Sequence, residues 1–162
     1  MPNLKGVADK LIHAFNTHDA AGLARLYAED QVTILPGAPG PVEGRKDKEA
    51  LVAGYFRAFP DLRLNISLVL ASGNHLVCEG RMKGTHNGPM VSPEGEMPPT
   101  GRPADIRMIF VLRVRPDGLI DEDRTYFDEA EFLKQLDLLE TVVCLGSSPR
   151  GTAAVALRAQ SV

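Results

Sequence analysis

Residues 103–115 alternate between apolar and other side chains, and this alternation constrains the fold more than any other part of the chain. One face of the segment is entirely apolar and consists of Ile106, Met108, Phe110, Leu112 and Val114. The opposite face mixes Ile109 and Val111 with arginines. Because successive side chains of a β-strand point to opposite faces, the segment predicts a strand with one face in the core. The mixed face is suited to partial cover by a second subunit.

Strand patterns also occupy residues 62–72, 75–86 and 119–127, with turn residues at 72–74 and 116–118. Short turns between alternating segments are typical of antiparallel neighbours. Together with residues 103–115, these segments predict an antiparallel meander.

The part of the chain before these strands is mostly helical in pattern. Apolar residues recur at helical spacing in residues 4–16, 19–27 and 46–59, and Pro60 ends the last of these helices. Residues 31–35 have the β-branched character of a first strand. Helices first and strands later predict the α+β class, with a curved antiparallel sheet wrapped around N-terminal helices.

The chain has 162 residues and a net charge of -3, from 18 basic and 21 acidic side chains. This length predicts one main domain, and the charge balance gives no electrostatic reason to expect a nucleic acid partner. No apolar run reaches the roughly 18 residues needed to cross a membrane, and the N-terminal residues show no export signal. We therefore expect a cytoplasmic protein without a membrane partner, in which Cys78 and Cys144 are reduced thiols.

Several motifs with a known chemistry are absent from the sequence: the P-loop, GxGxxG, GxSxG, HExxH and CxxC. Nucleotide, dinucleotide, serine hydrolase and structural zinc functions therefore have no support. The four histidines, at positions 13, 18, 75 and 86, are scattered. We expect neither a metal nor a cofactor. Acid–base chemistry in an apolar cavity remains, since burial can separate the pKa values of the few groups that it needs.

Six stretches of the sequence share their order and spacing with one protein family. They are FNTHDAAGLARLYAED (15–30), AFPDLR (58–63), GTHNG (84–88), PPTGR (98–102), GLI (118–120) and YFDEAEFLKQL (126–136). In this order they resemble the SnoaL-like polyketide cyclases. The resemblance implies the cone-shaped cavity of the ketosteroid isomerase-like, or cystatin-like, fold for residues 1–139. A C-terminal tail at 140–162 lies beyond it.

The resemblance also implies a cofactor-free cyclase or isomerase whose substrate is a small, hydrophobic, polyketide-like carbonyl compound. In this chemistry a carboxylate removes a proton from an activated carbon, and the enolate closes a ring in an aldol-type attack on a carbonyl. Two other functions stay open. One is a limonene-type epoxide hydrolase, which shares the fold and would use a carboxylate with Arg124 or Arg107. The other is a non-catalytic small-molecule-binding or dimerisation module, which a collapsed cavity would favour.

The resemblance assigns the general base to Asp128, because the family usually places an Asp in the YFD position before its closing helix. Asp128 also opens the sequence DEAE, residues 128–131, which is typical of a capped helix start. Strand alternation groups Asp121, Asp123 and Thr125 on one face, and Glu122, Arg124, Tyr126 and Asp128 on the other. Asp123 is therefore the alternative base. We expect the face with Tyr126 and Asp128 to point into the cavity.

Other side chains are candidates for substrate contacts. His86, within GTHNG, would polarise a substrate carbonyl; its alternative role is that of a loop histidine bonded to the backbone. Arg124 stands where relatives often have Trp. If it pointed inward it would pair with Asp128 and favour an anionic ligand, and if it pointed outward it would be a solvated strand residue. Aromatic side chains are expected to complete the binding surface, namely Tyr27, Tyr55, Phe59, Phe110 and Tyr126.

Residues 87–100 contain four prolines and two glycines between two predicted strands. A long loop of this composition is more often functional than structural, and it predicts a lid over the cavity. The mixed face of residues 103–115 leaves apolar surface that a symmetric partner would cover, and it predicts a homodimer or higher homo-oligomer.

Overall fold

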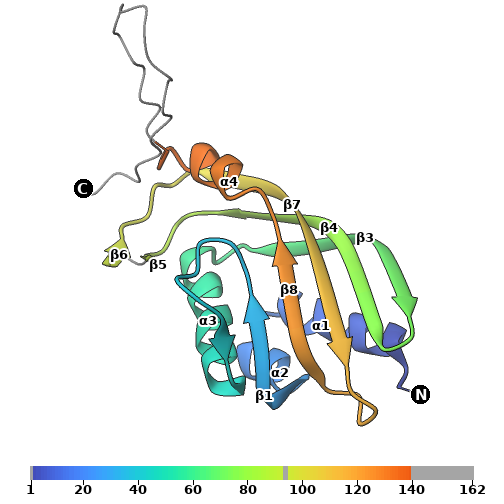
Figure 1. The fold of residues 1–162 in the computed structure, drawn as a ribbon. Helices are drawn as coiled ribbons and strands as arrows, with labels where there is room; N and C mark the ends of the chain where they lie inside the picture. The colour runs from blue at the N-terminus through green and yellow to red at the C-terminus, as the bar shows by residue number, and fades with distance from the viewer. Residues whose placement is uncertain (1, 93–94, 140–162) are drawn as a thin grey trace, which may run out of the picture.

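The computed structural model describes residues 2–92 and 95–139, which form helices packed against one curved sheet (Figure 1). The helices are α1 (Leu4–Asn16), α2 (Ala20–Ala24), α3 (Arg45–Ala58) and α4 (Glu129–Gln135). The large sheet contains β1 (Tyr27–Ile34), β2 (Val42–Glu43), β3 (Arg63–Ser72), β4 (His75–Thr85), β7 (Pro103–Val114) and β8 (Ile120–Tyr126). A separate small sheet pairs β5 (Met90–Ser92) with β6 (Gly95–Met97). The predicted α+β class is confirmed.

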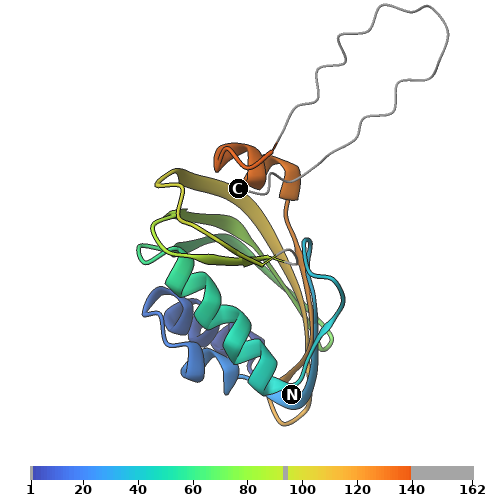
Figure 2. The same ribbon diagram turned by 90° about the vertical axis from the view of Figure 1, so that its left-hand side faces the viewer.

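The six strands of the large sheet lie in the order β2-β1-β8-β7-β4-β3. Strands β3, β4, β7 and β8 form the predicted antiparallel meander, while β1 runs parallel to β8 and joins the helical half to the sheet. Figure 2 shows α1, α2 and α3 in the hollow of the curved sheet, so that sheet and helices enclose a cone.

The core lies between the concave face of the sheet and these helices. Every inner-face residue of β7 predicted from the alternation is buried, whereas Ile109 on the outer face is 37% exposed. Asn3 is the N-cap of helix α1, and its side chain accepts a hydrogen bond from the N–H of Gly6. Its buried residues include Leu11 and Phe15, and the helix packs against β3. The apolar face of β7 and the apolar side of α1 thus belong to one core.

The predicted boundaries around Tyr27 are wrong. The helix expected over 19–27 ends at Ala24, and the strand expected over 31–35 begins at Tyr27 and ends at Ile34. Tyr27 pairs with Ile120 of β8 and is fully buried. Tertiary pairing here overrides a weak local helical pattern. The consequence is that Tyr27 belongs to the sheet that lines the cavity.

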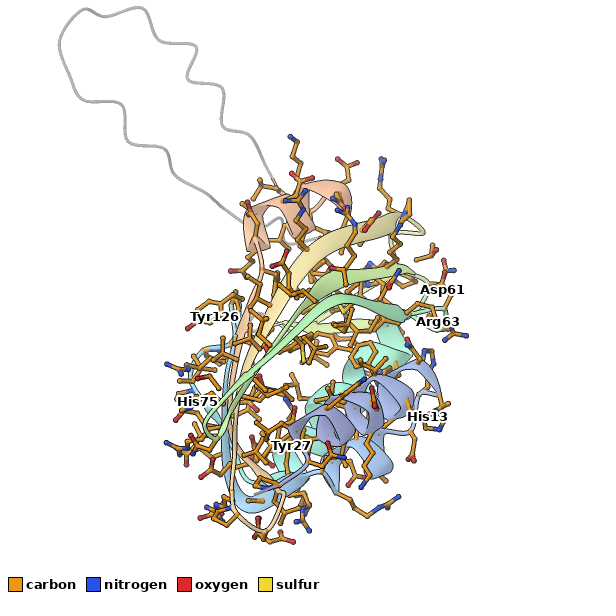
Figure 3. The ribbon with its side chains drawn as sticks, turned by 90° about the vertical axis from the view of Figure 1, so that its right-hand side faces the viewer. His13, Tyr27, Asp61, Arg63, His75 and Tyr126 are labelled. Atoms are coloured by element: carbon orange, nitrogen blue, oxygen red, sulfur yellow. The ribbon has the colours of Figure 1, made fainter. Side chains whose placement is uncertain are left out.

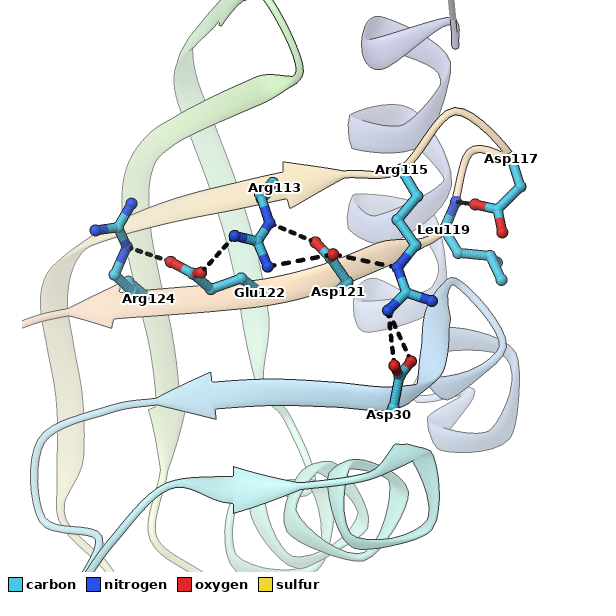
Figure 4. A network of polar contacts seen from close by, with 8 residues as sticks. All are labelled: Asp30, Arg113, Arg115, Asp117, Leu119, Asp121, Glu122 and Arg124. Atoms are coloured by element: carbon cyan, nitrogen blue, oxygen red, sulfur yellow. Dashed lines mark hydrogen bonds and ion pairs between the residues drawn. The ribbon is translucent and has the colours of Figure 1, made fainter.

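The outer face of the sheet carries a continuous series of ion pairs over β1, β7 and β8 (Figure 4). Its members are Asp30, Arg113, Arg115, Asp121, Glu122 and Arg124. These pairs are partly exposed to solvent, and surface pairs each contribute only about 0–1 kcal/mol to stability. Their main structural consequence is orientation, because they hold Asp121 and Glu122, two consecutive residues of β8, on the same outer side.

The predictions for the two cysteines and for the C-terminal tail can be compared with the structure only where residues are described. Cys78 is a buried free thiol, and burial raises its pKa to about 11. Cys144 and the tail at 140–162 lie outside the described residues. Among the residues that are described, no helix has the length and apolar character needed to cross a bilayer.

Candidate functional site

The cone encloses a cavity of about 940 Å³. Its walls come from the inner faces of β7 and β8, from one side of α3, from α4 and from the loop at 35–41. Most of the lining is apolar, as is usual for sites that bury a small organic ligand. The cone is thus open inside rather than filled by its own side chains.

Asp123 is the one buried carboxylate in residues 2–92 and 95–139, and it lines this cavity. It is 1% exposed. Its Oδ2 accepts hydrogen bonds from the hydroxyl of Tyr27, at 2.8 Å, and from Nζ of Lys48, at 2.7 Å. Its Oδ1 accepts one from the hydroxyl of Thr125, at 3.0 Å. Three elements therefore meet at this carboxylate: β1, α3 and β8.

Lys48 is held in place by a short series of buried hydrogen bonds. Its Nζ also donates to Oγ1 of Thr33, at 3.1 Å, and the hydroxyl of Thr33 donates to Oε1 of Gln31, at 2.8 Å. The Gln31 amide in turn donates to the backbone carbonyls of Val42 and Gly44. The ammonium lies 4.5 Å from the centre of the Tyr27 ring, within the range of a cation–π contact. Its position is thus fixed by groups other than Asp123 alone.

The two tyrosines that line the cavity remain neutral at physiological pH. Burial, followed by the charge of Asp123, raises the pKa of Tyr27 well above its usual value. Burial, followed by the charge of Glu129, raises the pKa of Tyr55 to about 12. Both hydroxyls therefore keep their protons, and the hydroxyl of Tyr27 donates a hydrogen bond to Asp123.

The expected orientation of β8 is wrong. Asp123 and Thr125 face the cavity, whereas Tyr126 is 52% exposed on the other side of the sheet, away from Tyr27 (Figure 3). The reason is a β-bulge: Arg113 and Val114 of β7 pair with Glu122 and Ile120, which leaves Asp121 as an extra residue in β8. Strict alternation from the buried Ile120 would therefore select the wrong face.

Asp128 lies outside the cavity wall. It is exposed, and its Oδ1 accepts a hydrogen bond from the N–H of Glu131, at 3.0 Å, as the N-cap of α4. Arg124 takes the outward orientation, so the pairing with Asp128 that an inward Arg124 would make does not occur: Nε of Arg124 contacts Glu122 on the outer face, at 3.1 Å (Figure 4). The geometry therefore gives Asp128 the capping role and brings Asp123, the alternative base, to the cavity.

We expect Asp128→Ala to lower the free energy of unfolding by about 1 kcal/mol, because the cap of α4 is lost. Asp128→Asn should stay near the wild-type value, since the Asn side chain caps a helix about as well as Asp. Urea denaturation of the two variants measures both effects. Equal stability of the Ala and Asn variants would mean that this cap contributes nothing.

His86 is fully buried but does not line the cavity. Its Nδ1 accepts a hydrogen bond from the N–H of Thr100, at 3.3 Å, and its ring stacks on Phe59 with centroids 5.2 Å apart. Burial lowers its pKa, which favours the neutral ring. Its backbone accepts from Gly101 and donates to Arg102. His86 thus holds the start of β7 against the end of β4, which corresponds to the structural alternative given above.

The six candidate substrate contacts divide evenly. Tyr27, Tyr55 and Phe110 line the cavity. Phe59 is buried behind it, between His86 and Phe132, and Arg124 and Tyr126 lie on the outer face. Residues in the core and residues on the cavity wall have the same apolar pattern in sequence, so the pattern alone does not separate them.

The sequence reasoning missed Lys48, Thr33 and Thr125 as members of the site. Lys48 had a readable signal, because it stands four residues before Val52 and eight before Phe56, on the buried face of α3. A lysine on the apolar face of a helix requires a partner, since an unpaired buried charge is costly. That partner is Asp123, 75 residues further along the chain.

The segment expected to act as a lid contributes to the cavity wall. Met90, Val91 and Met97, from β5 and β6, line the cavity, and β5 and β6 pair with each other rather than with the large sheet. Gating of the cavity by this segment stays a prediction. Within the described residues, no group of three or more His, Cys, Asp or Glu side chains is placed to hold a metal ion.

Solved structures share this architecture. The proposed polyketide cyclase IdmH from Streptomyces antibioticus is 30% identical, with a TM-score of 0.67 over 83% of this chain and 99% of its own. AclR from Streptomyces galilaeus, a proposed hydroxylase, is 23% identical, with a TM-score of 0.70 over 83% of this chain and 95% of its own. A ketosteroid isomerase-like protein from Catenulispora acidiphila is 19% identical, with a TM-score of 0.67 over 81% of this chain and 92% of its own. The latter two bear on the fold alone.

A search of curated proteins gave no significant match to the sequence. The profile of the SnoaL-like polyketide cyclases matches residues 5–136, which run from α1 through α4 and contain every described residue that lines the cavity. The protein therefore belongs to the SnoaL-like polyketide cyclase family.

Proposed function

We propose that the protein closes a ring in a polyketide-like carbonyl compound by an intramolecular aldol reaction, using only its own side chains, with Asp123 as the general base. The observation that carries this proposal is the position of Asp123, a buried carboxylate on the wall of an otherwise apolar cavity. Membership of a cyclase family supports the reaction class. A small, neutral, hydrophobic carbonyl compound is the substrate that such a lining favours.

The two carboxylate oxygens of Asp123 have different tasks in this reaction. Oδ2 is occupied by Tyr27 and Lys48, whereas Oδ1 accepts only the hydroxyl of Thr125. Oδ1 therefore has the free lone pair that takes the proton from a carbon activated by neighbouring carbonyls. The resulting enolate carbon attacks a second carbonyl of the same molecule, and the new alkoxide recovers the proton from Asp123. The apolar walls keep water from competing as a nucleophile or acid.

The alternative functions have less support. The epoxide hydrolase hypothesis needs an arginine beside the carboxylate, but Arg107 is exposed and Arg124 pairs with Glu122 on the outer face. The non-catalytic module would be favoured by a collapsed cavity, whereas this cavity measures about 940 Å³. Acid–base catalysis in the cavity is thus the better supported proposal.

Proton exchange at a carbonyl α-carbon tests the proposal without knowledge of the natural substrate. The bicyclic ketone 2-tetralone has the size and neutrality that the cavity favours, and NMR follows the replacement of its α-protons in D₂O. We expect the wild-type protein to accelerate this exchange in the presence of a chelator. Exchange no faster than with an equal concentration of an unrelated protein would contradict the proposed chemistry.

We also propose a homodimer formed through the outer face of the large sheet. Leu70 and Tyr126 are 54% and 52% exposed, and Ile109 lies beside Tyr126 in the register of β7 and β8. Exposed apolar side chains on a sheet face are typical of surfaces that a partner covers. Light scattering over a dilution series should give twice the mass of the chain at micromolar concentration. A mass of one chain throughout would exclude this dimer.

A further inference from the structure

The cavity wall carries few charged side chains, and its buried cation is already paired with its buried carboxylate. Lys48 is the one cationic side chain among the described residues that line the cavity, and its ammonium contacts Asp123 at 2.7 Å. Both side chains are almost fully buried, with exposed fractions of 7% for Lys48 and 1% for Asp123. The other charged residues of the wall, Asp47 and Glu129, are carboxylates at exposed positions. A buried negative charge elsewhere in the cavity would thus have no other cation to meet.

Proton transfer to Asp123 breaks this ion pair. When Asp123 takes a proton from a neutral carbon acid, the carboxylate becomes neutral and the negative charge moves to the substrate as an enolate. Lys48 then loses its charged partner. Two separated, unpaired charges in a low-dielectric cavity are strongly unfavourable, whereas a new contact between them restores one ion pair. The net charge of the site stays the same throughout the step.

The ammonium is placed to make that new contact. Lys48 donates to Asp123 and to Thr33, which uses two of the three N–H donors of an ammonium, and it lines the cavity. Thr33 and the Tyr27 ring hold the ammonium when the charge of Asp123 is gone. A donor that is already in position where charge develops stabilises a transition state without reorganisation.

We propose that Lys48 is the enolate-binding residue, and that the wall around it is a binding site for enolates and phenolates that becomes available when Asp123 is protonated. This inference rests on the proposed function for the identity of the base. Its tests are binding equilibria, so they give an answer whether or not any turnover is detected.

A pair of matched ligands separates the charge from the shape. The first is 5-phenylcyclohexane-1,3-dione, which is an enolate in neutral solution, and the second is its O-methyl enol ether, which has nearly the same shape and cannot ionise. Asp123→Asn imitates the protonated state of Asp123 and leaves Lys48 without a charged partner. Calorimetry should show that this variant binds the enolate about tenfold or more tightly than the ether, the effect of one charge-assisted hydrogen bond.

The double variant Asp123→Asn/Lys48→Met is the control, because it removes the ammonium and leaves no unpaired buried charge that would destabilise the protein. It should bind the two ligands with nearly equal affinity. The proposal is overturned if Asp123→Asn shows no preference for the enolate, or if the preference persists in the double variant.

Wild-type protein provides a test that does not depend on the folding of any variant. Binding of the preformed enolate beside Lys48 requires Asp123 to take up about one proton from solution, which follows from the charge argument above. Calorimetry in two buffers with different ionisation enthalpies measures this number directly. The expected result is uptake of about one proton with the dione, whose ultraviolet absorption in the complex stays that of the enolate, and of none with the ether. Enolate binding without proton uptake would contradict an exchange of ion-pair partners, and so would failure of the enolate to bind.

Discussion

Asp123→Asn is expected to lose roughly 100-fold or more of the catalysed exchange of 2-tetralone α-protons, the usual contribution of a positioned general base. The Asn side chain has nearly the same size and still accepts hydrogen bonds from Tyr27 and Lys48. It cannot accept a proton at neutral pH. The change therefore removes the base while it alters the cavity shape little.

Asp128→Asn is the matched control for this experiment, because it makes the same chemical change at the neighbouring candidate outside the cavity. We expect its exchange rate to remain within a factor of about 3 of the wild type, as for a residue that caps a helix away from the reacting atoms. If Asp128→Asn loses the activity and Asp123→Asn keeps it, the assignment of the base to Asp123 is wrong.

Lys48→Met should cost about 3–5 kcal/mol of unfolding free energy, because it leaves Asp123 as a buried charge without its partner. Met fills most of the space of the Lys stem, so the loss of charge dominates over the loss of volume. The double variant Lys48→Met/Asp123→Asn should regain most of this loss, since replacing both members of a buried ion pair is often nearly neutral.

Urea denaturation of the wild type, both single variants and the double variant gives the coupling energy of the pair. Additive effects of the two single changes would mean that the charges do not depend on each other. Loss of the charge of Asp123 would then give Lys48 no reason to bind a substrate enolate.

Much of the architecture was predictable from short-range patterns. The alternation in residues 103–115 correctly placed every inner-face side chain of β7, because a period of two leaves one choice once one face is apolar. The helical spacing around α1 was equally clear. At Tyr27 the local pattern failed, since pairing with β8 rather than local propensity decides its conformation.

From the sequence, the general base could be narrowed only to two alternatives, Asp123 and Asp128. The extra residue Asp121 in β8 is the reason. Polar side chains occupy both faces of β8, so hydrophobic pattern does not say which face is inside. The apolar Ile120 would suggest the phase of the strand, but the bulge after it reverses that phase before Asp123 is reached. Bulges depend on pairing with a neighbouring strand, and the sequence of one strand does not reveal them.

The polar cluster around Asp123, on a mostly apolar cavity wall, also bears on selectivity among equivalent positions of a substrate. A polyketide-like chain presents many similar carbonyls, and several ring sizes are chemically accessible to it. Under the proposed chemistry, only the carbon that comes to rest beside Asp123 is activated. The length of apolar wall on either side of Asp123 would then determine which carbon of the substrate chain reaches the carboxylate. Substitutions that shorten or lengthen the apolar path, rather than changes to the base, would be the way to alter which ring is formed.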